Sequence, residues 1–170
     1  ESVTIGSAIV FGGQVLAQAV NAAYRTIAKD RFIHSLHSYF LEAGDLNLPI
    51  TYDVAEMRNG GSFSTRRVTA SQKGKTIFIL AASFHKKEDG FEHQTNMNTN
   101  IKQPEELLSW EDMVTKFGDA LPKGIKSFLS IERPIDFKPV RIPNPLKPEN
   151  LPAKEEIWFK LKGDIPKMDT

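Results

Sequence analysis

The histidines are the side chains of this sequence with the most evident capacity for chemistry, because imidazole binds metals and transfers protons near neutral pH. There are four of them, and the sequence has no cysteine. His34 and His37 lie three residues apart in a predicted strand, where side chains three apart point to opposite faces. No two histidines have the four-residue spacing of a helical metal site. We therefore expect no metal site.

A second place for chemistry is the amino end of a predicted helix. Gly12 and Gly13 lie at the start of this helix, which is predicted over residues 13–28 because apolar residues recur there at spacings of three and four. The first amides of a helix point outward with a partial positive charge, so the backbone N–H groups of Gly13 and Gln14 are candidate donors to a carbonyl or phosphate oxygen. Alternatively, the glycines only let the chain turn into the helix. The residues alone leave both interpretations open.

The polar side chains of this helix can bind but cannot act as bases. It contains no carboxylate and no histidine, and its amide side chains are Gln14, Gln18 and Asn21. An amide can orient a water molecule or donate a hydrogen bond, but it does not accept a proton at neutral pH. The helix is therefore expected to shape a binding site rather than to supply a general base.

The elements that would position these groups follow from the rest of the pattern. Strand-like runs at residues 33–41, 50–57, 62–71 and 76–84 come after the helix, separated by turn signals such as Asn59-Gly60-Gly61. The short turns favour antiparallel pairing of neighbours, and residues 77–82, apolar on both faces, are expected in the middle of the sheet. We predict an α+β hot-dog fold, in which an antiparallel sheet wraps around one central helix.

Several segments, in order along the chain, carry a family resemblance: residues 10–14, 34–41, 44–45, 61–66, 82–84, 91–94, 132–134 and 144–146, together with Trp158. They resemble the first half of type II acyl-CoA thioesterases. The resemblance implies two hot-dog repeats in one polypeptide and hydrolysis of fatty acyl-CoA to free fatty acid and coenzyme A. Coenzyme A is then part of the substrate, and no separate cofactor is expected.

The resemblance places no catalytic residue in this chain, because the family's acid, hydroxyl and amide side chains belong to its second repeat and are expected beyond Thr170. Substrate binding is predicted at seven positions: Gly12, Gly13, Gln14, His37, Tyr39, Ser64 and Arg66. Arg66 and Arg67 point to opposite faces of their strand, so one of them could meet a coenzyme A phosphate. A structural role for His37 and solvated arginines are the simpler alternatives.

The predicted domain organisation has three parts. Residues 1–87 form the first hot-dog repeat, 88–130 a linker with short helices at 104–117 and 121–130, and 131–170 the opening strands of a second, incomplete repeat, at 131–142 and 157–161. Two strands do not make a stable sheet alone. We therefore expect a continuation of the chain or a partner to complete them, and exposed apolar surface around residues 131–161.

Composition restricts the partners. With 22 basic and 21 acidic residues, no nucleic-acid partner is indicated, and no segment has the roughly 20 apolar residues of a membrane span. The expected partners are fatty acyl-CoA and further copies of the chain, joined through the hot-dog sheets. The expected compartment is the cytoplasm, or the peroxisome in a eukaryote. A non-catalytic acyl-CoA-binding or assembly module is the alternative function, and a hot-dog hydratase or dehydratase is disfavoured because its Asp-to-His motif is absent.

Overall fold

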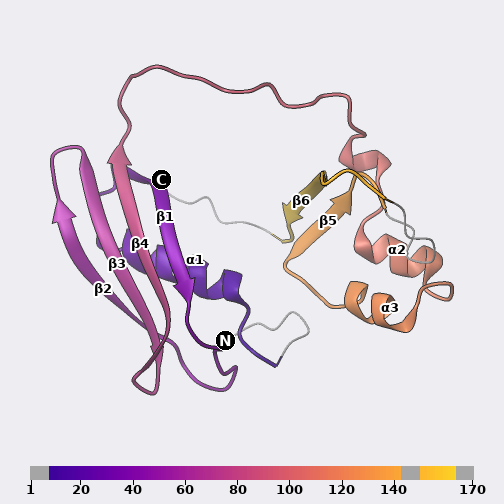
Figure 1. The fold of residues 1–170 in the computed structure, drawn as a ribbon, viewed down its shortest axis with the longest axis horizontal. Coiled ribbons are helices and arrows are strands. Elements are labelled where there is room, and N and C mark those ends of the chain that lie inside the picture. The colour runs from indigo at the N-terminus through magenta and orange to yellow at the C-terminus, as the bar shows by residue number, and fades with distance from the viewer. Residues whose placement is uncertain (1–7, 143–149, 164–170) are drawn as a thin grey trace. The chain divides into compact units, whose positions relative to one another are not determined.

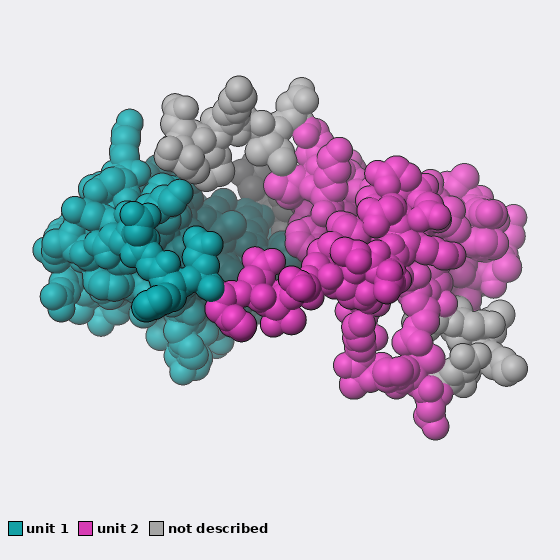
Figure 2. Space-filling view, turned by 90° about the horizontal axis from the view of Figure 1, so that it is seen from above, with its two compact units in different colours: residues 1–92, 169–170 teal, residues 93–168 magenta. Residues whose placement is uncertain are grey.

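The computed structural model describes residues 8–142 and 150–163 (Figure 1). They fall into two compact units, one within residues 1–92 and one within residues 93–168, which are described separately as unit 1 and unit 2 (Figure 2). Residues 144–146, which contribute to the family resemblance, lie outside the described residues. No helix in the described part of the chain is long and apolar enough to cross a membrane.

Unit 1 consists of one helix lying on one face of a four-stranded antiparallel sheet (Figure 1). The helix is α1 (Gly12–Tyr24), and the strands are β1 (Arg31–Phe40), β2 (Thr51–Asn59), β3 (Phe63–Gln72) and β4 (Lys75–Lys86). Their order in the sheet is β1-β4-β3-β2, so β4 is internal as predicted. The α+β class and the arrangement of sheet and helix predicted for this part of the chain are confirmed.

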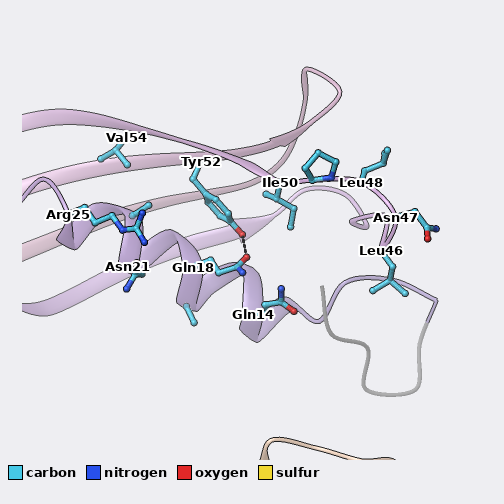
Figure 3. Close-up of a pocket in the computed structure, with 13 residues that line it drawn as sticks. Gln14, Gln18, Asn21, Arg25, Leu46, Asn47, Leu48, Ile50, Tyr52 and Val54 are labelled. Atoms are coloured by element: carbon cyan, nitrogen blue, oxygen red, sulfur yellow. Dashed lines mark hydrogen bonds between the residues drawn. The ribbon is translucent and has the colours of Figure 1, made fainter. Parts of the chain in front are cut away.

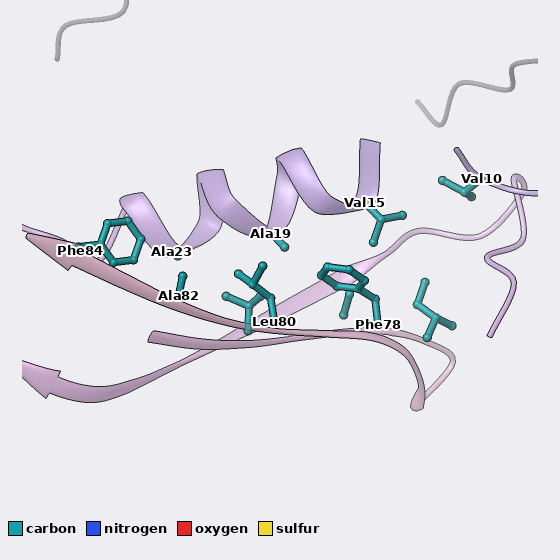
Figure 4. Close-up of a cluster of buried hydrophobic side chains, with 11 residues drawn as sticks. Val10, Val15, Ala19, Ala23, Phe78, Leu80, Ala82 and Phe84 are labelled. Atoms are coloured by element: carbon teal, nitrogen blue, oxygen red, sulfur yellow. The ribbon is translucent and has the colours of Figure 1, made fainter. Parts of the chain in front are cut away.

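The core of unit 1 lies between α1 and the inner face of the sheet (Figure 4). Ala19 and Ala23 are completely buried, and their small side chains allow the helix backbone to approach the sheet closely. Alternate residues of β4, from Phe78 to Phe84, meet them. The helical period of α1 and the alternation of β4 therefore decide together which side chains remain outside the core.

A β-bulge in β1 overturns one expectation about the histidines. The register of β1 against β4 shifts at residues 33–35, where one extra residue enters β1. His34 lies 2.9 Å from the hydroxyl of Ser83, and His37 pairs with Ala81. Ser83 and Ala81 both point away from α1, because the residues that alternate with them are buried against it. The prediction that His34 and His37 lie on opposite faces is wrong, because the bulge adds a residue to the alternation.

Unit 2 combines short helices with a hairpin-like pair of strands. Its elements are η1 (Pro104–Glu106), α2 (Trp110–Phe117), α3 (Lys123–Leu129), β5 (Ile135–Pro139) and β6 (Ile157–Leu161). The helix predicted over 104–117 is interrupted, because the chain is extended at Leu107 and a new helix begins at Ser109, whose side chain accepts from the N–H of Asp112 in a capping box. The predicted strand 131–142 is shorter than expected, at five residues.

Strands β5 and β6 pair only with each other among the described residues. Ile157, Phe159 and Leu161 share one face of β6, and the side chain of Phe159 is 70% exposed. The expectation of exposed apolar surface in this region is therefore confirmed. The helices and strands belong to the same compact unit. That residues 131–170 open a second hot-dog repeat stays a prediction.

Candidate functional site

A cleft of about 1000 Å³ runs along α1 in unit 1 (Figure 3). One wall is the polar stripe of the helix, formed by Gln14, Gln18, Asn21 and Arg25. The opposite wall comes from the connection between β1 and β2 and from the first half of β2, and it contributes Leu46, Asn47, Leu48, Pro49, Ile50, Tyr52 and Val54.

The core packing of α1 explains why these side chains face the cleft. Val15, Ala19 and Ala23 are buried against the sheet. Gln14, Gln18, Asn21 and Arg25 follow one another at spacings of four, three and four, which places them along a second stripe of the same helix. Burial of the apolar stripe thus orients an amide-rich stripe, ending in one guanidinium group, toward the cleft.

Tyr52 connects the two walls. Its hydroxyl donates a hydrogen bond of 2.8 Å to Oε1 of Gln18. Burial raises the pKa of Tyr52 to about 12, so the phenol remains protonated and acts as a donor at any physiological pH. The bond occupies the oxygen of Gln18 and leaves its amide nitrogen without a partner in the described part of the chain.

Polar contacts from Gln72 hold the wall of the cleft that lies opposite α1. The amide nitrogen of Gln72 donates to the carbonyls of Asp45 and Leu48 at 2.8 and 2.9 Å, and its oxygen accepts from the N–H of Asp45 at 2.8 Å. Asp45 also accepts from the N–H of Asn47 through its carboxylate, at 2.8 Å, as expected of an aspartate in a turn. Gln72, the last residue of β3, therefore supports the loop that forms part of this wall.

The chemistry available in the cleft is that of binding. The described residues that line it supply amides, a neutral phenol and one guanidinium group, but no carboxylate and no imidazole. Such groups donate and accept hydrogen bonds and attract anions, but none of them accepts a proton from water at neutral pH. The expectation that α1 shapes a site without supplying a base agrees with this lining.

The amino end of α1 lies beneath two aromatic rings. A Cβ atom added to Gly12 would lie 3.0 Å from the ring of Phe40, and one added to Gly13 would lie 2.6 Å from the ring of Phe11. Because these rings lie so close, a side chain at either position would crowd them, which explains why both residues are glycine. The N–H of Gln14 donates to the carbonyl of Phe11 at 3.0 Å. It is therefore committed to the first helical turn, which is a correction to its expected role as a donor to a ligand.

A mainly apolar cavity of about 350 Å³, whose lining also includes Glu42, adjoins this end of the helix. Gly12 and Val15 of α1 line it together with Phe40 and Leu41, which follow from β1, and with Phe78 of β4. Gly12 and Val15 belong to this cavity and Gln14 to the polar cleft, so the two linings meet in the first turn of α1.

His37 and Tyr39 lie elsewhere, on the face of the sheet that points away from α1. Both are exposed, with ring centroids 4.8 Å apart, and they line a separate cavity of about 300 Å³ together with Arg67. The structure therefore does not bring these two residues together with Gln14 in unit 1. Their role in substrate binding stays a prediction.

Ser64 and Arg66 are buried and engaged within the chain. Ser64 accepts from Arg31 at 2.7 Å. Arg66 is 1% exposed, and its guanidinium group donates to Thr26, Asn59 and Glu56. The expected placement of Arg66 and Arg67 on opposite faces is correct, but Arg66 is not solvated and offers no surface to a ligand in unit 1. All three nitrogens of its guanidinium group donate hydrogen bonds within the chain, so its role in unit 1 is structural.

Of the residues that line the cleft, only Gln14 was in the predicted set, and Arg25 and Tyr52 are two polar cleft residues that the sequence analysis did not name. Arg25 continues the spacing of Gln14, Gln18 and Asn21 by four residues, so the helical period contained that signal. Tyr52 lies two residues from Ile50 and from Val54, so the three side chains share one face of the chain at the start of β2. Only tertiary packing shows that this face meets α1. Among the described residues, no group of three or more histidine, aspartate or glutamate side chains could hold a metal ion.

Comparison with known proteins gives a consistent result. Residues 1–85 match a family model described as the acyl-CoA thioesterase N-terminal domain. Acyl-CoA thioesterase 2 of Haemophilus influenzae is 41% identical over 98% of this chain and 58% of its own length. Acyl-coenzyme A thioesterase 8 of Homo sapiens is 38% identical over 94% of this chain and 52% of its own length.

A solved structure shows the same likeness. The acyl-CoA thioesterase II TesB2 from Mycobacterium marinum has a TM-score of 0.67 and 32% sequence identity, over 92% of this chain and 53% of that chain. The present chain thus spans between half and three fifths of the length of these three proteins.

Proposed function

The chain belongs to the acyl-CoA thioesterase family, and on this premise we propose that the protein hydrolyses fatty acyl-CoA to a free fatty acid and coenzyme A. The match of residues 1–85 to the family's N-terminal domain carries this proposal. The α1 cleft supports it, because a slot with one polar and one apolar wall suits a long ligand that contains both kinds of group.

The lining of the cleft supports a division of roles. Hydrolysis requires that water lose a proton as its oxygen attacks the thioester carbon, and that the departing sulfur receive a proton when the carbon–sulfur bond breaks. No described residue that lines the α1 cleft performs the first task. We therefore assign substrate binding to the cleft, and the proton-accepting group to residues that do not line it.

The same observation favours one second candidate, a non-catalytic acyl-CoA-binding or assembly module. The two candidates differ in turnover but not in binding. The decisive experiment measures two quantities with the 170-residue chain: affinity for a non-hydrolysable thioether analogue of a long-chain acyl-CoA, and release of the coenzyme A thiol from the matching thioester.

We expect binding, with slow or no release of thiol by this chain and release by a full-length family member assayed beside it. Rapid release by the chain itself would mean that it contains the base, and alanine substitution of His37 would then be the first test. Absence of binding would contradict both candidates. Addition of water to an enoyl thioester would instead indicate a hydratase.

Two further proposals concern assembly and compartment. We propose that copies of the chain associate through their sheets, supported by the edge strand β1, on which Tyr39 and Phe40 are 57% and 58% exposed. Sedimentation analysis of the chain and of Tyr39→Lys would test this. The proposed compartment is the cytoplasm, or the peroxisome in a eukaryote, and imaging of the tagged full-length protein would test that.

A further inference from the structure

We propose that coenzyme A lies along α1 in one direction, with the thioester at the amino end of the helix and the phosphates at Arg25. The pantetheine arm would then occupy the α1 cleft, with its amides against Gln18 and Asn21. This inference rests on the proposed function, because it takes acyl-CoA as the ligand. It adds a direction of binding and a phosphate-recognising residue.

The two ends of α1 differ in polarity. The cavity at the amino end is bounded mainly by apolar side chains, and two of them, Phe40 and Leu41, are more than half exposed. Its described lining also includes the carboxylate of Glu42, which is paired with Lys75 and would repel a phosphate at this end. The cleft at the carboxyl end terminates in Arg25, the one charged residue among the described residues that line it. A molecule with a hydrocarbon tail and a phosphorylated head matches this polarity in one direction only, because the reverse direction would bring the tail to a guanidinium group.

Arg25 is available to an anion. Its guanidinium group has no ion pair or hydrogen bond in the described part of the chain, and the cleft contains no carboxylate to neutralise it. Arg31 and Arg66 of the same unit, by contrast, donate to several partners. A guanidinium group forms paired hydrogen bonds with phosphate oxygens. It also offsets the partial negative charge at the carboxyl end of a helix, which would otherwise repel a phosphate.

The amide side chains match the middle of the ligand. The pantetheine arm carries two amide groups joined through short methylene segments. A glutamine or asparagine side chain can donate a hydrogen bond to the carbonyl of such an amide and accept one from its N–H. The amide nitrogen of Gln18 and the whole amide of Asn21 have no partner among the described residues, since Tyr52 occupies only Oε1 of Gln18. The apolar wall opposite, from Leu46 to Ile50, would contact the methylene and methyl groups of the arm.

The length of the helix is also suitable. Gln14 and Arg25 are separated by eleven residues, which corresponds to about 16 Å along a helix axis. An extended pantetheine arm covers a similar distance between its sulfur and its first phosphate. With the phosphates at Arg25, the thioester reaches the first turn of α1, beside Gly13 and the apolar cavity.

The test separates the phosphates from the rest of the ligand. Binding is measured for two non-hydrolysable thioethers with the same acyl chain, one built on coenzyme A and one on pantetheine, which lacks the phosphates. The proteins are the wild-type chain, Arg25→Gln, and the control Lys29→Gln, which removes a nearby exposed cation that does not line the cleft. We expect Arg25→Gln to weaken binding of the coenzyme A ligand about tenfold and to leave the pantetheine ligand unchanged.

Asn21→Leu gives the complementary result, with both ligands weakened because both contain the amides. If Arg25→Gln has no effect, or weakens both ligands equally, the proposed direction is wrong, while the wild-type affinity for the coenzyme A ligand still supports the proposed function. If the wild-type chain binds neither ligand, both proposals fail. Circular dichroism of each variant verifies its fold, and Arg25→Lys, which retains the charge, is expected to recover part of the affinity for the coenzyme A ligand.

Discussion

Arg66 of β3 holds Thr26 at two points, donating from Nε to the Thr26 hydroxyl at 2.7 Å and from Nη2 to the Thr26 carbonyl at 2.8 Å. The hydroxyl of Thr26 in turn donates to the carbonyl of Ala23, in the last turn of α1, at 2.8 Å. These contacts tie the carboxyl end of α1 to the sheet. Because α1 carries one wall of the cleft, a buried arginine that touches no ligand determines where that wall lies.

The first prediction concerns this arginine. Arg66→Ala removes a buried guanidinium group and leaves several part-buried acceptors without their donor, so it is expected to lower the free energy of unfolding of unit 1 by roughly 3 kcal/mol. The measurement is urea unfolding followed by far-ultraviolet circular dichroism. Both tryptophans, Trp110 and Trp158, belong to unit 2, so tryptophan fluorescence of the same samples reports on unit 2 and should be unaffected.

The matched control is Arg67→Ala. Arg67 is the next residue, exposed on the opposite face of the same strand, and its loss should change the free energy of unfolding by no more than about 0.5 kcal/mol. Equal effects of the two substitutions would contradict the structural role assigned to Arg66.

The second prediction concerns the ionisation of Tyr52. Its pKa is raised by burial to about 12 in the folded chain, against 10.0 for an ordinary tyrosine. An ultraviolet titration of tyrosinate should therefore contain one step near pH 12 that disappears in Tyr52→Phe and persists in Tyr39→Phe. Between pH 10 and pH 12 the unfolded chain loses this proton first, so Tyr52 should make stability fall as pH rises, and Tyr52→Phe should lack that contribution.

The third prediction concerns Glu88. The hydroxyl of Ser62 donates to Glu88 at 2.7 Å, and this bond, followed by the neighbouring His85, holds the pKa of the Glu88 carboxyl below its usual value. Ser62→Ala should raise that pKa toward the usual value, as measured by NMR titration of the side-chain carboxyl carbons. Ser83→Ala removes a hydroxyl that contacts His34 instead and should leave Glu88 unchanged. An unchanged pKa in Ser62→Ala would show that the hydroxyl is not its main cause.

The fourth prediction concerns the capping box that begins α2. Ser109 accepts from the N–H of Asp112, and Asp112 accepts from both the N–H and the hydroxyl of Ser109, which lowers the pKa of its carboxyl. Ser109→Ala should cost unit 2 about 1 kcal/mol of unfolding free energy, followed by tryptophan fluorescence. The contribution of Asp112 is present at neutral pH and is lost as pH falls through its lowered pKa. Ser127→Ala, at an exposed position of α3, is the control.

The fifth prediction uses two glycines with different surroundings. A Cβ atom at Gly44 would lie 3.2 Å from the buried side chain of Val10, whereas one at Gly61 would meet nothing within 4 Å. Gly44→Ala should therefore destabilise unit 1 by about 1 to 3 kcal/mol through overpacking. Gly61→Ala should be neutral, or stabilising by about 0.5 kcal/mol because it restricts the unfolded chain. Thermal unfolding of both variants, followed by circular dichroism, tests the difference.

The sequence by itself determined the elements of unit 1 and their order. The helical spacing of Val15, Ala19 and Ala23 and the turn at residues 59–61 are local patterns, so they could be read without knowing what each element contacts. The same spacing showed that α1 has a polar stripe without a base. In unit 2 the local pattern was less reliable, because the cap at Ser109 starts a new helix inside a segment that resembled a single one.

Only the tertiary structure decided how the predicted site residues are distributed. The bulge that places His34 and His37 on one face is a register shift between two strands, the burial of Arg66 depends on partners up to forty residues away, and the meeting of Tyr52 with Gln18 joins a strand to a helix. Each depends on which distant backbone and side-chain groups come within hydrogen-bonding distance. The period of a sequence reports the face on which a residue lies, but not what that face meets.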